Sequence, residues 1–345
     1  MFALPTLDEI ESAAAIVYRA MPPTPQYRWP LLEQRAGRTL WVKHENHSPV
    51  GAFKVRGGLV YFDELQRSSN VPAHVIAATR GNHGQSIAYA ARQAKIAATI
   101  VVPLGNSTEK NAAMRALGAN VIEYGDDFQE SLEYAIELSR NEGYHFVPSF
   151  HPALIRGVAT YALELFRGAS HLDAVYVPIG LGSGICGLLA ARDALSPNTE
   201  VVAVVAEKAE AFALSIENDA ITSSPATTIA DGMACRTPNS DAFDILRRIR
   251  PRIVRVSDEQ IVAAARVLFT DTHNVAEGAG AASLAAALSD SQRERYGSCG
   301  IVLSGGNVDA ELFESMLGCA PQNRTETIDK SGFTSATGRE RAASR

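Results

Sequence analysis

The feature that most constrains the fold of this chain is a repeated alternation of short apolar segments with longer amphipathic ones. The apolar segments have the length of β-strands, and the segments between them carry apolar side chains at helical spacing. Strands are predicted at Val75–Ala78, Ala98–Val102, Asn120–Glu123 and Tyr144–Phe146, with helices at Gly84–Gln93, Lys110–Leu117 and Phe128–Glu142 between them. Buried strands separated by helices are typical of a parallel sheet that helices cover on both faces.

A second series of the same kind follows a helix predicted over Ala153–Phe166. Its strands are predicted at Ala174–Pro178, Glu200–Ala206, Ile253–Arg255 and Cys299–Leu303, and its helices at Ile185–Leu195, Glu259–Thr272 and Gly278–Ala287. Ahead of both series, the pattern predicts a helix over Asp8–Met21, an extended connector to Pro30, a strand over Thr39–His44 and a helix from about Phe53 to Leu65.

The polar link from Gln66 to Pro72 indicates a boundary between two domains. We predict an α/β fold in which residues 1–66 and 152–319 form a large domain and residues 67–151 form a small one. Each domain is expected to be a mostly parallel sheet flanked by helices. Residues 320–345 are polar and rich in Ser, Thr and Arg, so we expect a disordered tail there.

The composition argues against several kinds of partner. With 345 residues, 46% of them hydrophobic, the chain is long enough to bury large cores. Its net charge of -6 and the lack of a Lys/Arg run argue against nucleic acid and anionic membranes as partners. The longest uncharged stretch, Ala174 to Ala191, is interrupted by Pro178 and four glycines and is not a membrane span. Acidic residues near the start and scattered cysteines lead us to expect a cytoplasmic enzyme with reduced thiols.

Lys54 stands out because it is predicted in the first turn of a helix, directly after the turn Ser48–Gly51. The helix dipole disfavours a cation at this end of a helix. If the side chain points inward, the loss of hydration lowers its pKa and makes it a candidate amine for a Schiff base. The alternative is an ordinary surface lysine, which this residue alone does not exclude.

A glycine-rich segment, Ile179-Gly180-Leu181-Gly182-Ser183-Gly184, directly follows a predicted strand and opens a helix. Glycines let backbone N–H groups converge on an anion, and the start of the helix adds positive potential, so a phosphate fits here. A dinucleotide is one alternative, because Glu207 ends the next strand, although Ile185 replaces the third glycine of G-x-G-x-x-G. A tight turn between strand and helix is the other alternative.

Three further segments place polar residues at the ends of strands or helices. Thr79-Arg80-Gly81-Asn82-His83-Gly84 lies between a strand and a helix, where backbone donors can hold a carboxylate, but an N-cap turn also explains it. Ser304 closes the last strand at the end where α/β proteins bind ligands, and a simple turn is the alternative. Glu277 begins a helix, where capping alone would explain a carboxylate.

Together and in this order, the segments resemble the fold type II pyridoxal-phosphate (PLP) enzymes, which share the fold of the tryptophan synthase β chain. The similarity is to the serine/threonine dehydratase and serine racemase group, and it covers about residues 5–318. That group has a lysine after Gly-Ser-Phe, a Ser-x-Gly-Asn-His-Gly loop, a glycine-rich phosphate loop, a Glu-Pro/Gly-x-Gly-Ala helix start and a Ser-Gly-Gly-Asn turn.

The resemblance implies that PLP is the cofactor and that Lys54 carries it as a Schiff base. The other cofactor contacts that it implies are Phe53, Asn82, Gly180, Leu181, Gly182, Ser183, Gly184, Glu277 and Ser304. Ser304 is expected beside the pyridine nitrogen, where a neutral hydroxyl leaves the ring unprotonated and favours β-elimination over transamination. The expected substrate-binding residues are Thr79, Arg80, Gly81, Asn82 and His83.

The chain departs from the pattern of this group at several positions. Ala52 replaces the serine that usually precedes Phe-Lys, and Arg80 stands where the racemases have a serine that acts as a second base. Glu207 matches a metal ligand of some members, but the aspartate position falls on Ala213, so we expect no metal site. His151 replaces a common aspartate. The chain also ends without the regulatory domain of biosynthetic threonine deaminases, so isoleucine feedback is not expected.

The resulting hypothesis is a PLP-dependent ammonia-lyase that converts a β-hydroxy-α-amino acid, such as L-threonine or L-serine, to a 2-oxo acid and ammonia by α,β-elimination. The same chemistry on 3-phenylserine or 3-hydroxyaspartate and PLP-dependent β-replacement are alternatives. An NAD-binding oxidoreductase or a non-catalytic nucleotide module is an alternative of a different class. Because relatives are usually dimers or tetramers, the resemblance implies a homodimer or homotetramer.

Overall fold

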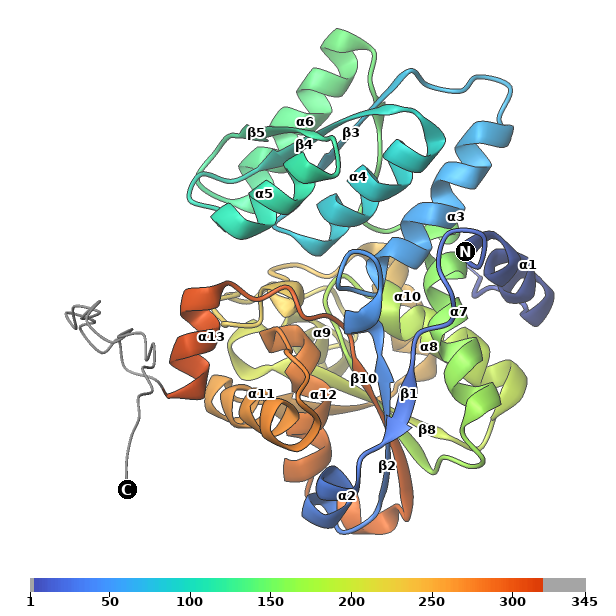
Figure 1. Cartoon of the computed structure of the whole chain (residues 1–345), viewed down its shortest axis with the longest axis vertical. Coiled ribbons are helices and arrows are strands. Elements are labelled where there is room, and N and C mark those ends of the chain that lie inside the picture. The colour runs from blue at the N-terminus through green and yellow to red at the C-terminus, as the bar shows by residue number, and fades with distance from the viewer. Residues whose placement is uncertain (1–2, 319–345) are drawn as a thin grey trace, which may run out of the picture.

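The computed structural model describes residues 3–318, which form two α/β units stacked one above the other (Figure 1). The upper unit contains a four-stranded sheet in the order β5-β4-β3-β6, and the lower unit a six-stranded sheet in the order β1-β2-β10-β7-β8-β9. All strands of the upper sheet come from residues 67–151, the predicted small domain. The predicted tail, residues 320–345, lies outside the described residues.

The four-stranded sheet is parallel throughout, as predicted. Its strands are β3 (His74–Ala78), β4 (Ala97–Val102), β5 (Asn120–Glu123) and β6 (His145–Phe146), joined by α4 (Asn82–Ala94), α5 (Thr108–Ala116) and α6 (Phe128–Glu142). Successive residues of β3 face different apolar clusters, because Val75 and Ala77 pack with α4 while Ile76 and Ala78 pack with α6. Helices on both faces explain why residues 75–78 of this strand are all apolar.

In the six-stranded sheet, the edge strand β1 (Gln26–Arg28) runs antiparallel to β2 (Thr39–His44). The other strands pair in parallel and are β10 (Ser298–Leu303), β7 (Ala174–Pro178), β8 (Glu200–Ala206) and β9 (Arg252–Val256). Val175 and Val177 of β7 pack in the cluster that contains α1 (Leu7–Val17), α7 (Pro152–Gly168) and α8 (Ser183–Leu195). Tyr176 packs instead with α11 (Asp258–Thr272) and α12 (Gly278–Ser289).

Several short elements of the fold were not predicted from the sequence. These are β1 and the helices α2 (Pro30–Ala36), α9 (Ala211–Glu217), α10 (Ser240–Ile249) and α13 (Ala310–Leu317). Helices this short show few turns of periodic pattern, and tertiary packing decides whether they form. In addition, α4 and α8 each begin two residues earlier than predicted, at Asn82 and Ser183. The candidate ligand-binding loops therefore continue directly into the first turns of helices.

The strand order brings three candidate segments to one edge of the six-stranded sheet. β2, β10 and β7 are parallel neighbours, so their carboxyl ends meet at the same edge. β2 leads through the short 3-10 helix Glu45–His47 to α3 (Lys54–Arg67), β10 leads to Ser304, and β7 leads to the glycine-rich loop. Because parallel α/β sheets bind ligands beyond the carboxyl ends of their strands, these segments are placed to form one site.

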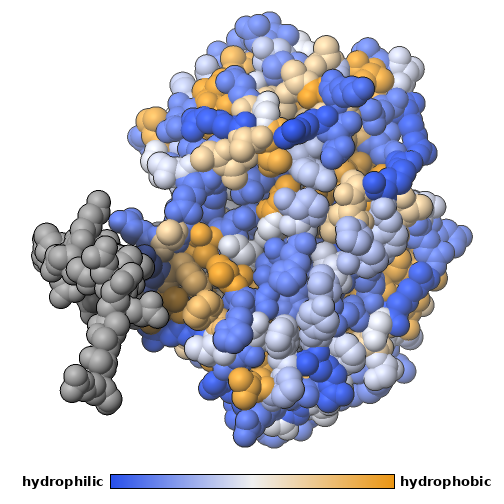
Figure 2. Space-filling model, viewed as in Figure 1, coloured by the Kyte–Doolittle hydropathy of each residue, from blue (hydrophilic) through white to orange (hydrophobic). Residues whose placement is uncertain are grey.

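One face of the molecule is shown in Figure 2 by the hydropathy of its residues. The face in Figure 2 is mainly hydrophilic, and its apolar residues form small separate groups because helices cover the apolar strands. Between residues 3 and 318, no helix is both long enough and apolar enough to cross a membrane. The cysteines of this part of the chain, Cys186, Cys235 and Cys299, are buried free thiols.

Candidate active site

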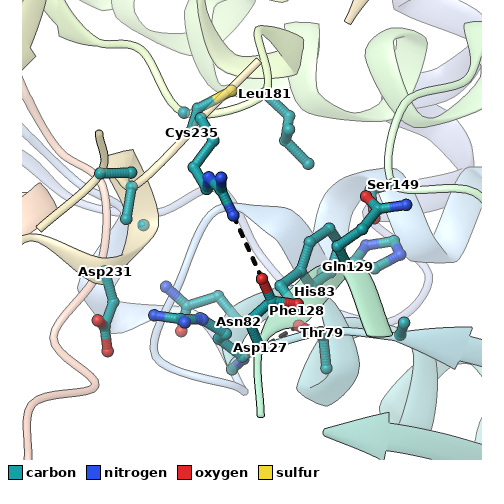
Figure 3. Close-up of a pocket in the computed structure, with 18 of the residues that line it drawn as sticks. Thr79, Asn82, His83, Asp127, Phe128, Gln129, Ser149, Leu181, Asp231 and Cys235 are labelled. Atoms are coloured by element: carbon teal, nitrogen blue, oxygen red, sulfur yellow. Dashed lines mark hydrogen bonds and ion pairs between the residues drawn. The ribbon is translucent and has the colours of Figure 1, made fainter. Parts of the chain in front are cut away.

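A cavity of about 990 Å³ lies between the two units. Figure 3 shows that residues of the upper unit, such as Asn82 and Asp127, face residues of the lower unit, such as Leu181 and Asp231, across this space. Among the predicted site residues, those that line the cavity are Lys54, Thr79, Arg80, Gly81, Asn82, His83, Gly180, Leu181 and Glu277. Phe53, Gly182, Ser183, Gly184 and Ser304 lie just behind this lining, as the contacts below show.

Lys54 is the first residue of α3 and lines the cavity. Ser86 holds its backbone by donating a hydrogen bond of 2.7 Å from Oγ to the Lys54 carbonyl. Its Nζ lies 5.0 Å from the centre of the Phe53 ring. Burial lowers the pKa of Lys54 to about 8, and the nearby Glu277 carboxylate opposes this change only in part. Lys54 is therefore not an ordinary surface lysine, because it lines the cavity and its burial favours the neutral, nucleophilic form of the amine.

The chain before Lys54 is fixed to the end of β10. The Phe53 N–H donates to the Ser304 carbonyl at 3.0 Å, and Ala52 forms an isolated β-bridge with Gly305. The Phe53 ring packs edge-on against Tyr161, with ring centres 6.1 Å apart. Ser304 itself is buried, and its hydroxyl makes no hydrogen bond within residues 3–318. This hydroxyl is thus available to a bound group next to the lysine.

The glycine-rich loop has the properties of an anion cradle. The backbone N–H groups of residues 181–184 donate no hydrogen bond to any described part of the chain, and residues 183 and 184 form the first turn of α8. Side chains are excluded where the loop turns, since a Cβ at Gly180 would lie 2.1 Å from the Gly232 carbonyl oxygen and Gly182 has φ +103°. Unpaired donors at the start of a helix bind a phosphate well.

Glu277 does not cap its helix, so the capping explanation is wrong. It occupies the N-cap position of α12, but its side chain makes no capping hydrogen bond. Its Oε1 instead accepts from Asn82 Nδ2 at 2.7 Å, and Asn82 Oδ1 accepts from Asn307 Nδ2 at 2.8 Å. Burial raises the pKa of Glu277 to about 7. This chain of hydrogen bonds joins the upper unit to the lower one at the floor of the cavity.

The turn before α4 presents free donors to the same cavity. Thr79 Oγ1 accepts from the N–H groups of Gly81 and Gly84 at 3.0 and 3.3 Å, which holds the turn in shape. The N–H groups of Asn82 and His83 have no acceptor within the described residues. Burial and the charge of Lys54 lower the pKa of His83 to about 3, so its ring is neutral. Two free amides at a helix start suit a substrate carboxylate.

The structure separates three other residues from the site. Glu207 is exposed and Ala213 is buried, and residues 3–318 contain no group of three His, Cys, Asp or Glu side chains that could hold a metal ion. His151 caps α7, where its Nδ1 accepts from the Ala153 N–H at 3.2 Å. His151 does not line the cavity. Histidine in place of the usual aspartate therefore changes the N-cap of α7 and not the cavity lining.

The sequence analysis also missed functional candidates that lie far apart along the chain. Lys110, Asp127 and Arg236 line the cavity, although no motif surrounds them. The Lys110 ammonium pairs with Asp231 at 3.1 Å, and an Asp127 oxygen lies 3.3 Å from an Arg236 nitrogen. The one available signal was Asp127, a favourable N-cap residue directly before a predicted helix. Its partner comes from the segment 220–239, which has no periodic pattern.

Comparison with known proteins agrees with this geometry. The profile of the family described as "Pyridoxal-phosphate dependent enzyme" matches residues 17–305. An L-threo-3-hydroxyaspartate ammonia-lyase from Pseudomonas sp is 35% identical over 300 residues, which cover 85% of this chain and 92% of that protein. This chain belongs to the family of pyridoxal-phosphate-dependent enzymes.

Other members of the family differ in length. The biosynthetic L-threonine dehydratase of Escherichia coli is 34% identical over 303 residues, or 86% of this chain, but the match spans only 58% of that enzyme. Among solved structures, maize serine racemase has a TM-score of 0.84 at 27% identity and covers 92% of this chain and 98% of its own. A threonine deaminase from T.th. has a TM-score of 0.81 at 34% identity and covers 88% of this chain and 99% of its own.

The residues present fit the cofactor of this family. The free amides of residues 181–184 suit its phosphate, Lys54 is an amine that can bind its aldehyde, and the unpaired Ser304 hydroxyl lies behind the lysine at the end of the neighbouring strand. The match to the family of pyridoxal-phosphate-dependent enzymes over residues 17–305 favours this cofactor over the dinucleotide alternative.

Proposed function

We propose that this protein is a PLP-dependent dehydratase that converts a β-hydroxy-α-amino acid, such as L-threonine or L-serine, to a 2-oxo acid and ammonia. The observation that carries the proposal is the position of Lys54. Its amine, with a pKa lowered to about 8, shares one cavity with two sets of unpaired backbone amides. One set suits a phosphate and the other suits a substrate carboxylate.

In the proposed reaction, the amides of Asn82 and His83 hold the substrate carboxylate at the start of α4. The cofactor, when bound, carries the substrate amine and withdraws electrons from Cα. Neutral Lys54 then removes the Cα proton, since its pKa lies close to the working pH. The Cα–H and Cβ–O bonds break and a Cα=Cβ bond forms, which gives water and an enamine. Water hydrolyses the enamine to the 2-oxo acid and ammonia.

Arg80 makes racemisation an unfavourable side reaction in this proposal. Racemisation needs a second base on the face of Cα opposite Lys54, and a guanidinium stays protonated near neutral pH. Arg80 lines the cavity next to the carboxylate-binding turn, so it is placed to bind an anion. We expect chiral analysis of L-serine or L-threonine incubated with the enzyme to show little of the D-epimer. Rapid epimerisation by the unmodified enzyme would show that Arg80 does not prevent racemisation.

The direct test is an assay for 2-oxo acid and ammonia with L-threonine, L-serine, 3-phenylserine and 3-hydroxyaspartate as substrates. We expect product with at least one substrate from the PLP-loaded protein, and none from a Lys54→Ala variant. The matched control is Lys208→Ala, which removes an exposed lysine outside the cavity. Equal turnover by the Lys54→Ala protein would refute the proposal.

We also propose that the enzyme works in the cytoplasm as a homodimer or homotetramer. The buried free thiols of Cys186, Cys235 and Cys299 support a reducing compartment. The oligomeric state follows from the resemblance to the serine/threonine dehydratase group. Light scattering of the purified protein measures it directly, and a mass of one chain would contradict the proposal.

A further inference from the structure

We infer that Arg80 and Arg236 form a subsite for a second carboxylate on the substrate, and that Asp127 occupies this subsite when no such substrate is bound. The inference rests on the proposed function and narrows its substrate class. The favoured substrate would be an α-amino acid that carries both a hydroxyl and a carboxylate on Cβ. Asp127 would act as a built-in competitor of that carboxylate.

The first line of evidence is the pairing of charges in the cavity. Apart from Lys54, its cations are Arg80, Lys110 and Arg236. Lys110 is neutralised by Asp231 at 3.1 Å. Arg80 has neither a hydrogen bond nor an ion pair with the described residues, although it lines the cavity and is partly buried. A cation held in a cavity without a partner favours an anionic ligand.

The second line of evidence is the double role of Asp127. Its Oδ1 accepts from the Glu130 N–H at 3.0 Å, which caps α6, while its Oδ2 lies 3.3 Å from Nη1 of Arg236 (Figure 3). The pKa of Asp127 is lowered first by this cap, and the charges of Arg236 and Arg80 add to the effect. One carboxylate oxygen thus lies in the field of two guanidinium groups at the cavity wall.

The contact between Asp127 and Arg236 can be exchanged at low cost. The Arg236 side chain is 73% exposed and that of Asp127 is 40% exposed, so water screens the pair. Release of Oδ2 leaves the helix cap intact, because the cap uses Oδ1. A ligand carboxylate can therefore replace Asp127 beside Arg236 without unfolding the start of α6.

The third line of evidence is the position of Arg80 relative to the free amides. Arg80 belongs to the same turn as Asn82 and His83, whose N–H groups are free of acceptors among residues 3–318. One small dicarboxylate can place one carboxylate on these amides and the other near the two arginines. A guanidinium recognises a carboxylate through two parallel hydrogen bonds, whereas the methyl group of threonine gains nothing from it.

The test compares two substitutions that break the same ion pair from opposite sides. In the PLP-loaded enzyme, Arg236→Gln should lower the ratio of kcat/KM for 3-hydroxyaspartate to that for L-threonine about fivefold, because a charge-assisted but water-screened hydrogen bond is lost. Asp127→Asn keeps the helix cap but removes the competing charge, so it should raise the same ratio about threefold. Arg115→Gln, at an exposed arginine paired with Glu123 outside the cavity, is the matched control and should leave the ratio unchanged.

The opposite signs separate a subsite from a simple closure contact. If the pair only held the two units together, both substitutions would break it and would shift the ratio in the same direction. A shift in the same direction, or no shift in either variant, would overturn the inference. An Arg80→Ser variant should lower the ratio as Arg236→Gln does, and an unchanged ratio in this variant would exclude Arg80 from the subsite.

A binding measurement keeps this inference distinct from the proposed function. L-malate and L-lactate cannot react, and they differ in the second carboxylate. Calorimetric titration of the PLP-loaded protein should show tighter binding of L-malate, with affinity decreased by Arg236→Gln and increased by Asp127→Asn. If no amino acid is dehydrated but L-malate behaves in this way, the subsite stands and the proposed function fails. If threonine is dehydrated and neither substitution changes the affinity for L-malate, the subsite fails alone.

Discussion

Two groups of arginine and carboxylate side chains lie near the candidate site, and they differ in burial and in the number of contacts that hold them. The first is buried behind Lys54 and consists of Arg56, Glu45, Glu164 and Lys43. The second, Arg236 with Asp127, spans the mouth of the cavity. The comparison shows how the same chemical groups can fix one part of a site and leave another part exchangeable.

The buried group fixes the helix that carries the lysine. Arg56 is completely buried and lies two residues after Lys54 on α3. Its Nε donates to Glu45 at 2.7 Å, and its Nη1 and Nη2 donate to Glu164 at 2.6 and 2.8 Å. Lys43 adds a second cation, whose Nζ pairs with Glu164, so the charges balance. Because Glu45 follows β2 and Glu164 belongs to α7, the group ties α3 to two neighbouring elements.

The group at the mouth has the opposite properties. Arg236 is 73% exposed at its side chain, and a single contact of 3.3 Å joins it to Asp127. Exposed pairs of this kind contribute about 0–1 kcal/mol, whereas removal of one partner from a buried group leaves a charge without solvent or counterion. Arg56→Met and Arg236→Gln test this difference, and Glu277→Gln tests another buried charge at the same site.

The largest effect is expected from Arg56→Met. This substitution leaves the carboxylates of Glu45 and Glu164 buried with only Lys43 as a cation. We expect a loss of about 3–5 kcal/mol of unfolding free energy, measured by urea denaturation of the PLP-loaded protein. A loss below about 1 kcal/mol would mean that the buried group does not hold α3. The two groups would then not differ in how strongly they stabilise the structure.

A second, pH-dependent effect is expected from Glu277→Gln on the floor of the cavity. In the protein without cofactor, burial raises the pKa of Glu277 from the usual 4.5 to about 7. Between these values the folded state binds more protons than the unfolded state, so stability falls as pH rises from 4.5 to 7. Glutamine cannot ionise, and the variant should lack this decline, which amounts to about 3 kcal/mol. If the unfolding free energies of the two proteins change in parallel between pH 4.5 and 7, the pKa of Glu277 is not raised.

The smallest effect on stability is expected from Arg236→Gln. Its ion pair is exposed and screened by water, so the unfolding free energy should change by less than about 1 kcal/mol. The same urea denaturation as for Arg56→Met measures it, which makes the two arginines a matched pair. A loss comparable to that of Arg56→Met would show that the mouth is as rigid as the buried side.

The sequence predicted most of the fold because its long elements carry strong patterns. The strands Asn120–Glu123, Ala174–Pro178 and Glu200–Ala206 agree with the structure at both ends. Short elements were missed, and α9 is an example, since its seven residues make only about two helical turns of pattern. Such elements form because the rest of the fold gives them a surface to pack on.

Site residues that lie in local sequence motifs could be predicted. Site residues that are distant in the sequence and contact each other only in the folded chain could not. Lys54, Asn82 and Glu277 line the cavity as expected, although the hydrogen bond from Asn82 to Glu277 joins residues 195 positions apart. No pattern along the chain brings Asp127 together with Arg236. Likewise, nothing in the sequence around Lys43 and Glu45 shows that they are buried partners. In the structure Glu45 pairs with Arg56, and Lys43 pairs with Glu164. Pairings of this kind depend on tertiary structure.

The most direct test of the account is the identity of the residue that holds the cofactor. Purified PLP-loaded protein should be reduced with borohydride, digested with a protease and analysed by mass spectrometry. We expect the reduced cofactor on the peptide that contains Lys54, and none on a Lys54→Ala protein. Cofactor attached to another lysine, or a reduced protein with no attached cofactor, would contradict the central claim.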